Sequence, residues 1–292
     1  MTADSAIHQR FAWLLRAASR VAGGWNRVAD GWNRVGAQVK FYSMAVTEMR
    51  TAFVRYGKEI IRLVAQMSLG TGALAVIGGT VVIVGFLTLS TGAVIAVQGY
   101  NQLSGIGVEA MTGFISAYVN VRIISPAVAG VGLAATIGAG ATAQLGAMRI
   151  ADEIDALEVM AVRSVAYLVS TRVVAGVVVV IPLYCVAVVC AFQAARFGTT
   201  GIYGQSTGVY DHYFRTFLNS TDLLWSFVTV ITAAIAVMLV HTYYGYNASG
   251  GPAGVGRAVG HSVRTSLIVL TLIVLAISLS VHGQSGHFNL SG

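Results

Sequence analysis

The chain has 292 residues, of which 56% are hydrophobic and only 10% are charged. A soluble globular domain carries about 25% charged residues, so this composition excludes an ordinary soluble protein and indicates a polytopic membrane protein. The net charge of +7 does not indicate a nucleic-acid partner, because ten of the 18 Lys and Arg residues fall within residues 1–62, a bias typical of orientation in a membrane.

The amino-terminal segment, residues 1–65, is predicted to form an amphipathic helix on the cytoplasmic surface of the membrane. The sequence Gly-Trp-Asn-Arg-Val occurs at residues 24–28 and again at residues 31–35. This offset puts the two tryptophans on nearly one face of a helix, with the two arginines also aligned. Tryptophan beside arginine is typical of the lipid headgroup layer, and an ordinary soluble helical tail is the alternative.

Five apolar segments follow, and each lies in a stretch of about 20 residues or more without a charged side chain, the length that a membrane-spanning helix needs. Their expected bounds are about 71–97, 125–148, 172–196, 223–246 and 265–282. We therefore expect an all-α membrane protein with one helical domain over residues 66–283 and a short tail over residues 284–292.

The distribution of basic residues predicts how these helices cross the membrane. Five spans put the two termini on opposite sides. With the amino terminus in the cytoplasm, fifteen basic residues lie on the inner side and three on the outer side. The positive-inside rule favours this orientation, with an extracytoplasmic carboxy terminus. The expected location is the plasma (inner) membrane.

Small residues recur at intervals of four along the second apolar segment. They are Gly130, Ala134, Gly138, Thr142 and Gly146. Side chains of this size let another helix approach closely, so the pattern fits either static packing or a seam that slides during transport. Pro126 is expected at the start of this helix, where its missing N–H costs little.

A block of acidic residues lies between the second and third segments. It consists of Asp152, Glu153, Asp155 and Glu158. Helical spacing puts Ile154, Leu157 and Ala161 on one face and the acids on the other. We expect a short amphipathic helix within residues 149–163 at one face of the membrane, where a soluble partner docks.

Later segments carry weaker signals. Pro182 is expected to kink the third helix. The tyrosines of the outer loop 198–222 fit either an interfacial aromatic belt or a contact with an external partner. His241 is expected at the membrane interface, at the inner end of the fourth helix.

Several functional classes are disfavoured by what the sequence lacks. The only Gly-Lys pair, Gly57-Lys58, is followed by Glu59, so there is no P-loop and any ATP with its Mg²⁺ is expected on a partner protein. No histidines have metal-ligand spacing. Because the spans appear almost free of ionisable groups, proton-coupled transport and intramembrane catalysis are not expected. We expect a non-catalytic subunit without a cofactor, metal or catalytic residue of its own.

The residues around the acidic block resemble a known family. The chain resembles the MlaE/YrbE permeases of lipid ABC transporters in three motifs, which are GAGATAQLGAMR at 138–149, DEIDALEVM at 152–160 and YLVSTR at 167–172. Supporting matches are QGY at 98–100, GYN at 245–247 and GVGR at 254–257. VHTYYGYNASGGP at 240–252 and the ending FNLSG most resemble a B-type YrbE permease of an actinobacterial (mycobacterial) Mce system.

This resemblance implies partners and roles. It implies a heterodimer with an A-type YrbE permease, a cytoplasmic ATPase dimer that binds ATP and Mg²⁺, and an extracytoplasmic hexamer of Mce proteins. The cargo implied is a lipid, either a fatty acid or a sterol, imported across the plasma membrane. The residues implied in ATPase coupling are Arg149, Asp152, Glu153, Asp155, Leu157, Glu158 and Arg163. Candidates for the lipid cavity, by analogy alone, are Gln98, Tyr100 and Ile123. The alternative is a membrane scaffold that anchors the Mce proteins and moves nothing.

Three positions depart from the family pattern. Ile123, Thr136 and Gln144 stand where better-known relatives have Glu, Arg and Glu. Either the partner permease has taken over the charged groups, or the substrate of this chain carries less charge. The sequence leaves both explanations open.

Overall fold

The computed structural model describes residues 36–69 and 79–282. The Trp-Arg repeat, the first part of the first expected span and the carboxy-terminal tail lie outside the described residues. The chain divides into two units, Met1–Val46 and Thr47–Gly292. In the first unit the described residues 36–46 are helical. The elements below belong to the second unit.

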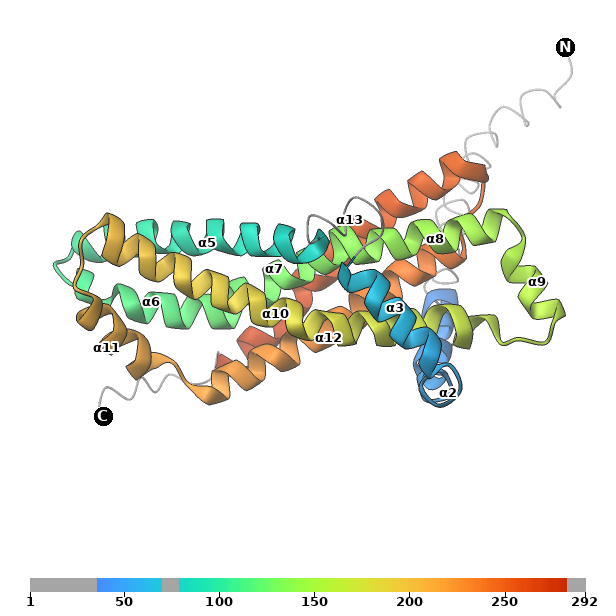
Figure 1. Ribbon diagram of the computed structural model, residues 1–292, viewed down its shortest axis with the longest axis horizontal. Helices are drawn as coiled ribbons and strands as arrows, with labels where there is room; N and C mark the ends of the chain where they lie inside the picture. Colours follow the sequence, from blue (N-terminus) through green and yellow to red (C-terminus); the bar gives the residue numbers. More distant parts are fainter. Residues whose placement is uncertain (1–35, 70–78, 283–292) are drawn as a thin grey trace, which may run out of the picture. The chain divides into compact units, whose positions relative to one another are not determined.

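The second unit is a succession of helices (Figure 1). Two short helices, α2 (Met49–Arg55) and α3 (Gly57–Leu69), precede α5 (Gly79–Ser104). The next long helix comprises η1 (Glu109–Met111), α6 (Thr112–Val119), η2 (Asn120–Ile124), α7 (Ser125–Gly132), η3 (Leu133–Gly138) and α8 (Ala139–Ile150). After it come α9 (Glu153–Val159), η4 (Val165–Ser170), α10 (Thr171–Phe197), η5 (Gly198–Ile202), α11 (Thr207–Phe217), α12 (Ser220–Tyr246) and α13 (Gly251–His282). The segments η2 to η5 are π-helical.

Within the part of the chain that the structure describes, five helices are long and apolar enough to cross a membrane. They are Gly79–Ser104, Glu109–Ile150, Val165–Ile202, Ser220–Tyr246 and Gly251–Val281. Over residues 36–69 and 79–282 all regular structure is helical and no strand occurs. The prediction of an all-α protein with five candidate membrane-spanning helices is therefore confirmed for the described residues.

Several of these helices extend beyond the ends that the charged residues suggested. The second, third and fifth begin at Glu109, Val165 and Gly251, not at 125, 172 and 265. Arg122 lies inside a helix, and its guanidinium donates to Asp222 at 2.8 Å. Arg172 is also inside a helix and donates to the Leu168 carbonyl at 2.8 Å. Since a partnered charge can lie within a helix, charge-free stretches underestimate helix length.

The position of one of the two prolines differs from expectation. Pro126 is not at the start of the second spanning helix but inside it, near the beginning of α7. The π-helical turn η2 directly precedes α7, and such a turn relaxes the hydrogen-bond ladder that proline interrupts. Pro182 lies within α10, which is one continuous helix from Thr171 to Phe197.

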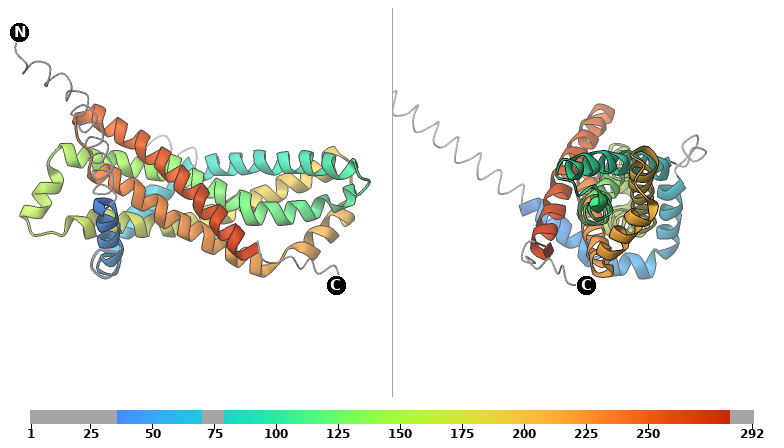
Figure 2. Two further views of the ribbon diagram at one scale, coloured as in Figure 1. Left: turned by 180° about the vertical axis from the view of Figure 1, so that it is seen from behind. Right: turned by 90° about the vertical axis from the view of Figure 1, so that its left-hand side faces the viewer.

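The helices pack closely where small residues meet. Helix α10 packs against α3, α5 and α12, and α12 packs against α8 and α13. Figure 2 shows α13 crossing its neighbours obliquely. At Gly92 of α5, an added methyl group would lie 2.5 Å from the backbone oxygen of Ala191 in α10. Glycine at this position therefore sets how closely the two helices approach.

The expected outer loop 198–222 is mostly helical. It contains η5 and α11, and α11 packs against α6. Tyr210 is 1% exposed and donates a hydrogen bond to Ser116 at 2.8 Å, so it belongs neither to an aromatic belt nor to an external contact surface. Tyr203 stacks on Tyr100 at 4.3 Å between ring centroids. These aromatic side chains therefore hold α11 and η5 against the spanning helices.

Candidate functional site

The acidic segment forms α9, which lies at the opposite end of the helical unit from α11 (Figure 1). The chain turns into and out of α9 through left-handed backbone at Asp152 and Ala161, with φ of 55° and 58°. Such a conformation is unfavourable for a residue with a Cβ by about 1–3 kcal/mol, so the surrounding contacts must hold it.

One face of α9 anchors it to the spanning helices. Ile154 is fully buried and packs with Leu145 and Leu168, and Leu157 packs against the same cluster. Ala161, expected on this face, instead lies beyond the end of the helix and is exposed. The apolar anchor of α9 is therefore shorter than the sequence pattern suggested.

Two of the four acids also hold α9 in place. Asp155 forms an ion pair with Arg149 at 2.5 Å. Glu158 accepts hydrogen bonds from Ser164 at 2.6 Å and from Tyr246 at 3.1 Å. These contacts join α9 to α8 and to the end of α12, while both Asp155 and Glu158 remain exposed.

The other residues assigned to coupling are exposed as well. Asp152 and Glu153 are exposed, and neither forms an ion pair among the described residues. Arg163 donates to Glu48 at 2.9 Å but remains 65% exposed. Charged side chains that a soluble partner can reach therefore lie along the whole of α9 and just beyond its end.

Val159 and Met160, which sequence reasoning did not single out, are the most prominent apolar side chains at this end. Val159 is 89% exposed and Met160 is 64% exposed, at the end of α9. In the sequence they could have been noticed as two adjacent apolar residues that lie outside every expected membrane span. Exposed apolar side chains beside exposed acids are typical of a protein-binding surface.

The helix α8 connects α9 to the interior through the small-residue stripe. A methyl group added at Gly130 or Gly146 would meet Leu270 or Val255 of α13, at 2.5 and 2.9 Å. One added at Gly138 would lie 2.5 Å from the His241 ring of α12. Ala134 and Thr142 are fully buried. The stripe therefore faces α12 and α13, and only small residues fit there.

His241, near the end of α12, lies at the centre of this contact. Its side chain is fully buried. Its Nδ1 is 2.9 Å from Thr142 Oγ1, and its Nε2 is 3.0 Å from Ser266 Oγ. Thr142 is also 3.1 Å from Ser262 Oγ. This cluster joins α8, α12 and α13. Since His241 is ionisable and lies within α12, the expectation that the spans are almost free of ionisable groups is wrong at this position.

The other face of the same helix lines a cavity of about 370 Å³. Helix α3, the beginning of α5, the π-helical segment η3 and α8 form its walls. The lining residues are Leu63, Gln66, Met67, Gly79, Thr80, Ile83, Ala135, Thr136, Ile137, Gly140, Ala141 and Gln144. π-Helical turns are frequent at functional sites, and η3 contributes three of these residues.

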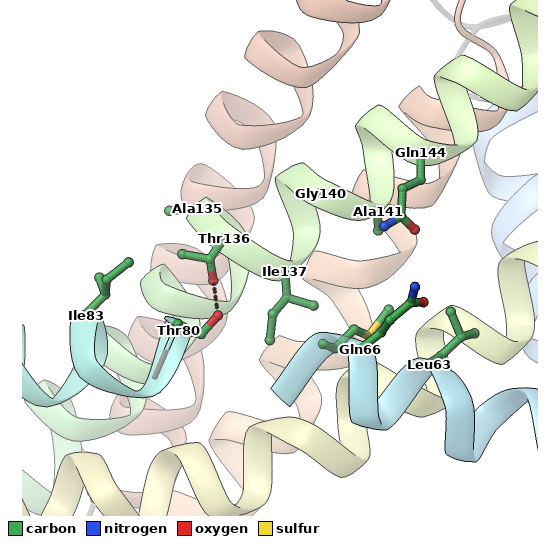
Figure 3. A pocket seen from close by; sticks show the side chains of 12 residues that line it. Leu63, Gln66, Thr80, Ile83, Ala135, Thr136, Ile137, Gly140, Ala141 and Gln144 are labelled. Carbon is green, nitrogen blue, oxygen red and sulfur yellow. Dashed lines mark hydrogen bonds between the residues drawn. The ribbon is translucent and has the colours of Figure 1, made fainter. Parts of the chain in front are cut away.

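Uncharged polar groups lie at two places in this cavity (Figure 3). Thr80 donates to Thr136 at 3.0 Å. Gln66 and Gln144 extend into the space between α3 and α8 from opposite sides, with Ile137 between them and the threonine pair. Thr136 and Gln144 are two of the three positions where this chain departs from the family pattern, so the structure brings those two together.

The three cavity candidates taken by analogy lie elsewhere. Gln98 and Tyr100 are inside α5, not after its end, and Tyr100 stacks on Tyr203. Ile123 is 43% exposed in η2. None of the three lines the cavity described above. The described residues also contain no group of three or more side chains suited to a metal ion.

The ion pair on α3 bears on the charge around this cavity. Arg62 donates to both carboxylate oxygens of Glu59. The hydrogen bond to Glu59 raises the pKa of Arg62 above its ordinary value. Arg62 is therefore a permanent cation whose charge is already matched.

Comparisons with known proteins agree with this architecture. The family model described as Permease MlaE matches residues 69–280. A probable ABC transporter permease protein of Rickettsia bellii is 29% identical over 199 residues, which are 65% of this chain and 73% of that protein. The intermembrane phospholipid transport system permease protein MlaE of Haemophilus influenzae is 26% identical over 186 residues, 63% of this chain and 71% of that protein.

A more distant relative is found in plants. The chloroplastic protein TRIGALACTOSYLDIACYLGLYCEROL 1 of Arabidopsis thaliana is 23% identical over 189 residues, 64% of this chain and 52% of that protein.

Proposed function

Because the chain belongs to the MlaE permease family, we propose that it is the membrane subunit of an ATP-driven lipid importer whose ATPase is a separate protein. Permeases of this family are multi-pass membrane subunits of lipid ABC transporters and are generally not catalytic. The proposal adds the route by which ATP-driven motion reaches the lipid.

The observation that carries the proposal is that one helix connects a docking surface to a cavity. Helix α9 presents Val159, Met160 and the acids Asp152 and Glu153 at its free side. Through Arg149 and Asp155 it is tied to α8. Helix α8 in turn lines the cavity with Gly140, Ala141 and Gln144. A displacement of α9 would therefore be passed directly to the cavity wall.

In the proposed mechanism, the cytoplasmic ATPase dimer binds ATP and Mg²⁺ and closes around α9. Val159 and Met160 enter an apolar groove of the ATPase, and basic side chains at its rim pair with Asp152 and Glu153. Ile154 and Leu157, which fix α9 to the spanning helices, transmit the movement. The cavity then changes shape around the lipid.

The proposed assembly follows the resemblance to B-type YrbE permeases. The second permease is an A-type YrbE chain, and a hexamer of Mce proteins on the extracytoplasmic side delivers the lipid, a fatty acid or a sterol. The amino terminus and α9 are cytoplasmic. The basic residues of the inner segments support this orientation.

The test is Val159→Asp in the complete complex reconstituted in proteoliposomes. A carboxylate cannot enter an apolar groove without losing its hydration, so ATP-dependent lipid transport should fall at least about tenfold and the ATPase should dissociate more readily. Ile106→Asp is the matched control, because Ile106 is 74% exposed in the turn after α5. It should transport as the unchanged protein does.

Two outcomes would contradict the proposal. Undiminished transport by Val159→Asp would remove α9 from the coupling route. An assembled wild-type complex that hydrolyses ATP, retains the Mce proteins and moves no lipid would instead favour the scaffold role.

A further inference from the structure

The cavity between α3, α5, η3 and α8 is lined by polar and apolar residues but by no charged residue. Four of its side chains are uncharged and can both donate and accept hydrogen bonds, namely Gln66, Thr80, Thr136 and Gln144. The remaining side chains of its lining are aliphatic or sulfur-containing, or the residue is glycine. No Asp, Glu, Lys, Arg or His is among them.

The two stretches of sequence that contain the lining residues are also free of charged side chains. No charged residue occurs between Arg62 and Glu109, a stretch that contains all the lining residues from α3 and α5. None occurs between Arg122 and Arg149, which contains those from η3 and α8.

Two arginines lie on α3 and on the helix that packs against it, and neither lines the cavity. Arg62, one turn before Gln66 on α3, forms an ion pair with Glu59. Arg172 of α10, against which α3 packs, donates from one guanidinium nitrogen to the Leu168 carbonyl, while its Nε has no hydrogen-bond partner among the described residues. Because no lining residue of the cavity is charged, an anionic headgroup there would lose its hydration without a counter-charge from the lining, which is strongly unfavourable.

The size of the cavity limits what part of a lipid it holds. Ligand pockets range over about 300–1,000 Å³, and this cavity of about 370 Å³ is at the lower end. It fits one end of a lipid better than a whole diacyl lipid. Amide and hydroxyl groups at two places suit a ligand group that both donates and accepts hydrogen bonds.

We propose that this cavity binds the uncharged polar end of a lipid, a hydroxyl, ester or amide group, and discriminates against anionic headgroups. This inference rests on the proposed transport function and narrows its substrate class. Between the two lipids considered above, it favours the hydroxyl of a sterol over the carboxylate of a fatty acid.

The test compares two photoreactive probes that share one alkyl chain. One is a long-chain alcohol and the other is its sulfate ester, which is anionic at every pH used. Each is crosslinked to the complete complex in nanodiscs without ATP, and the labelled peptides are identified by mass spectrometry. We expect the alcohol to label the peptide containing Thr136 and Gln144 at least about tenfold more than the sulfate.

Two variants separate charge from shape. Gln144→Lys places a cation in the cavity and should shift labelling toward the sulfate, by about tenfold in the ratio of the two probes. Gln102→Lys is the matched control, because Gln102 is exposed near the end of α5 and does not line the cavity. Its labelling ratio should equal that of the unchanged complex.

The proposal is overturned if the sulfate labels the unchanged cavity as strongly as the alcohol does, or if neither probe labels this peptide. It is also overturned if Gln144→Lys leaves the ratio unchanged. Because labelling requires no ATP, a complex that labels as expected but transports nothing would contradict only the proposed transport function.

Discussion

At the scale of single residues, Gly138 shows why the small-residue stripe has the composition it has. The His241 ring of α12 lies directly over Gly138, and Thr142, one turn further along, bonds to the same ring. A side chain at position 138 would push the imidazole away from both of its partners, Thr142 and Ser266. Glycine is therefore required here for space, because its backbone has right-handed helical angles that any residue can adopt (φ −62°, ψ −49°).

We predict that Gly138→Ala destabilises the protein by about 1–3 kcal/mol, through overpacking and loss of the His241 hydrogen bonds. Unfolding in a denaturing detergent titration measures the change. Gly260→Ala is the control, since an added methyl group at Gly260 of α13 meets nothing within 4 Å. Alanine favours a helix more than glycine does, so this control should be neutral or slightly stabilising. Equal effects of the two substitutions would show that the His241 contact contributes little.

At the scale of elements, α11 is held by a buried hydrogen bond. Tyr210 donates to Ser116 of α6, and the ring of Phe214 stacks on the Tyr210 ring. Burial raises the pKa of Tyr210 to about 12 from the ordinary value of 10.0, and the bond to Ser116 opposes this shift only in part. The phenol therefore stays neutral and keeps its donor over the whole physiological range.

This pKa gives a prediction with a definite sign. The raised value in the folded protein means that the contribution of Tyr210 to stability is complete below about pH 10 and is lost as the pH rises toward 12. Compared with Tyr210→Phe, the unchanged protein should be about 1 kcal/mol more stable from pH 7 to 9. That advantage should shrink above pH 10, as measured by melting temperature in nanodiscs. A constant difference at all pH values would contradict the assignment.

At the scale of the whole helical unit, one ion pair connects helices that are far apart in the chain. Arg122 of η2 donates two hydrogen bonds to Asp222 of α12, at 3.2 and 2.8 Å, and its guanidinium lies 3.8 Å from the centre of the Tyr118 ring. Both charged side chains are mostly buried, at 17% and 15% exposed. The pair thus fixes the second spanning helix to the fourth.

We predict that Asp222→Asn or Arg122→Met alone destabilises the unit by about 2–4 kcal/mol, because each leaves the other partner buried with an unmatched charge or hydrogen bond. The double variant should be less destabilised than the sum of the two single variants. Detergent-induced unfolding of all four proteins gives the coupling energy. Additive effects would mean that the two charges are solvated independently.

The sequence by itself determined the class of protein, the number of spanning helices and the position of α9. These follow from local properties, since a run of apolar residues and a cluster of acids are read from neighbours in the chain. The motifs around residues 138–160 were likewise sufficient for the family.

Only the tertiary structure decided where the helices end, what surrounds His241 and which residues form the cavity. The charge of Arg122 predicted a helix end there. In the structure Arg122 lies within a helix and pairs with Asp222, which is a hundred residues away in the chain. Thr136 and Gln144 line a cavity together with Thr80 and Gln66, which come from other helices. The physical reason is the same in each case: burial and partnering of a polar group depend on residues that are distant in the chain, and no local pattern records them.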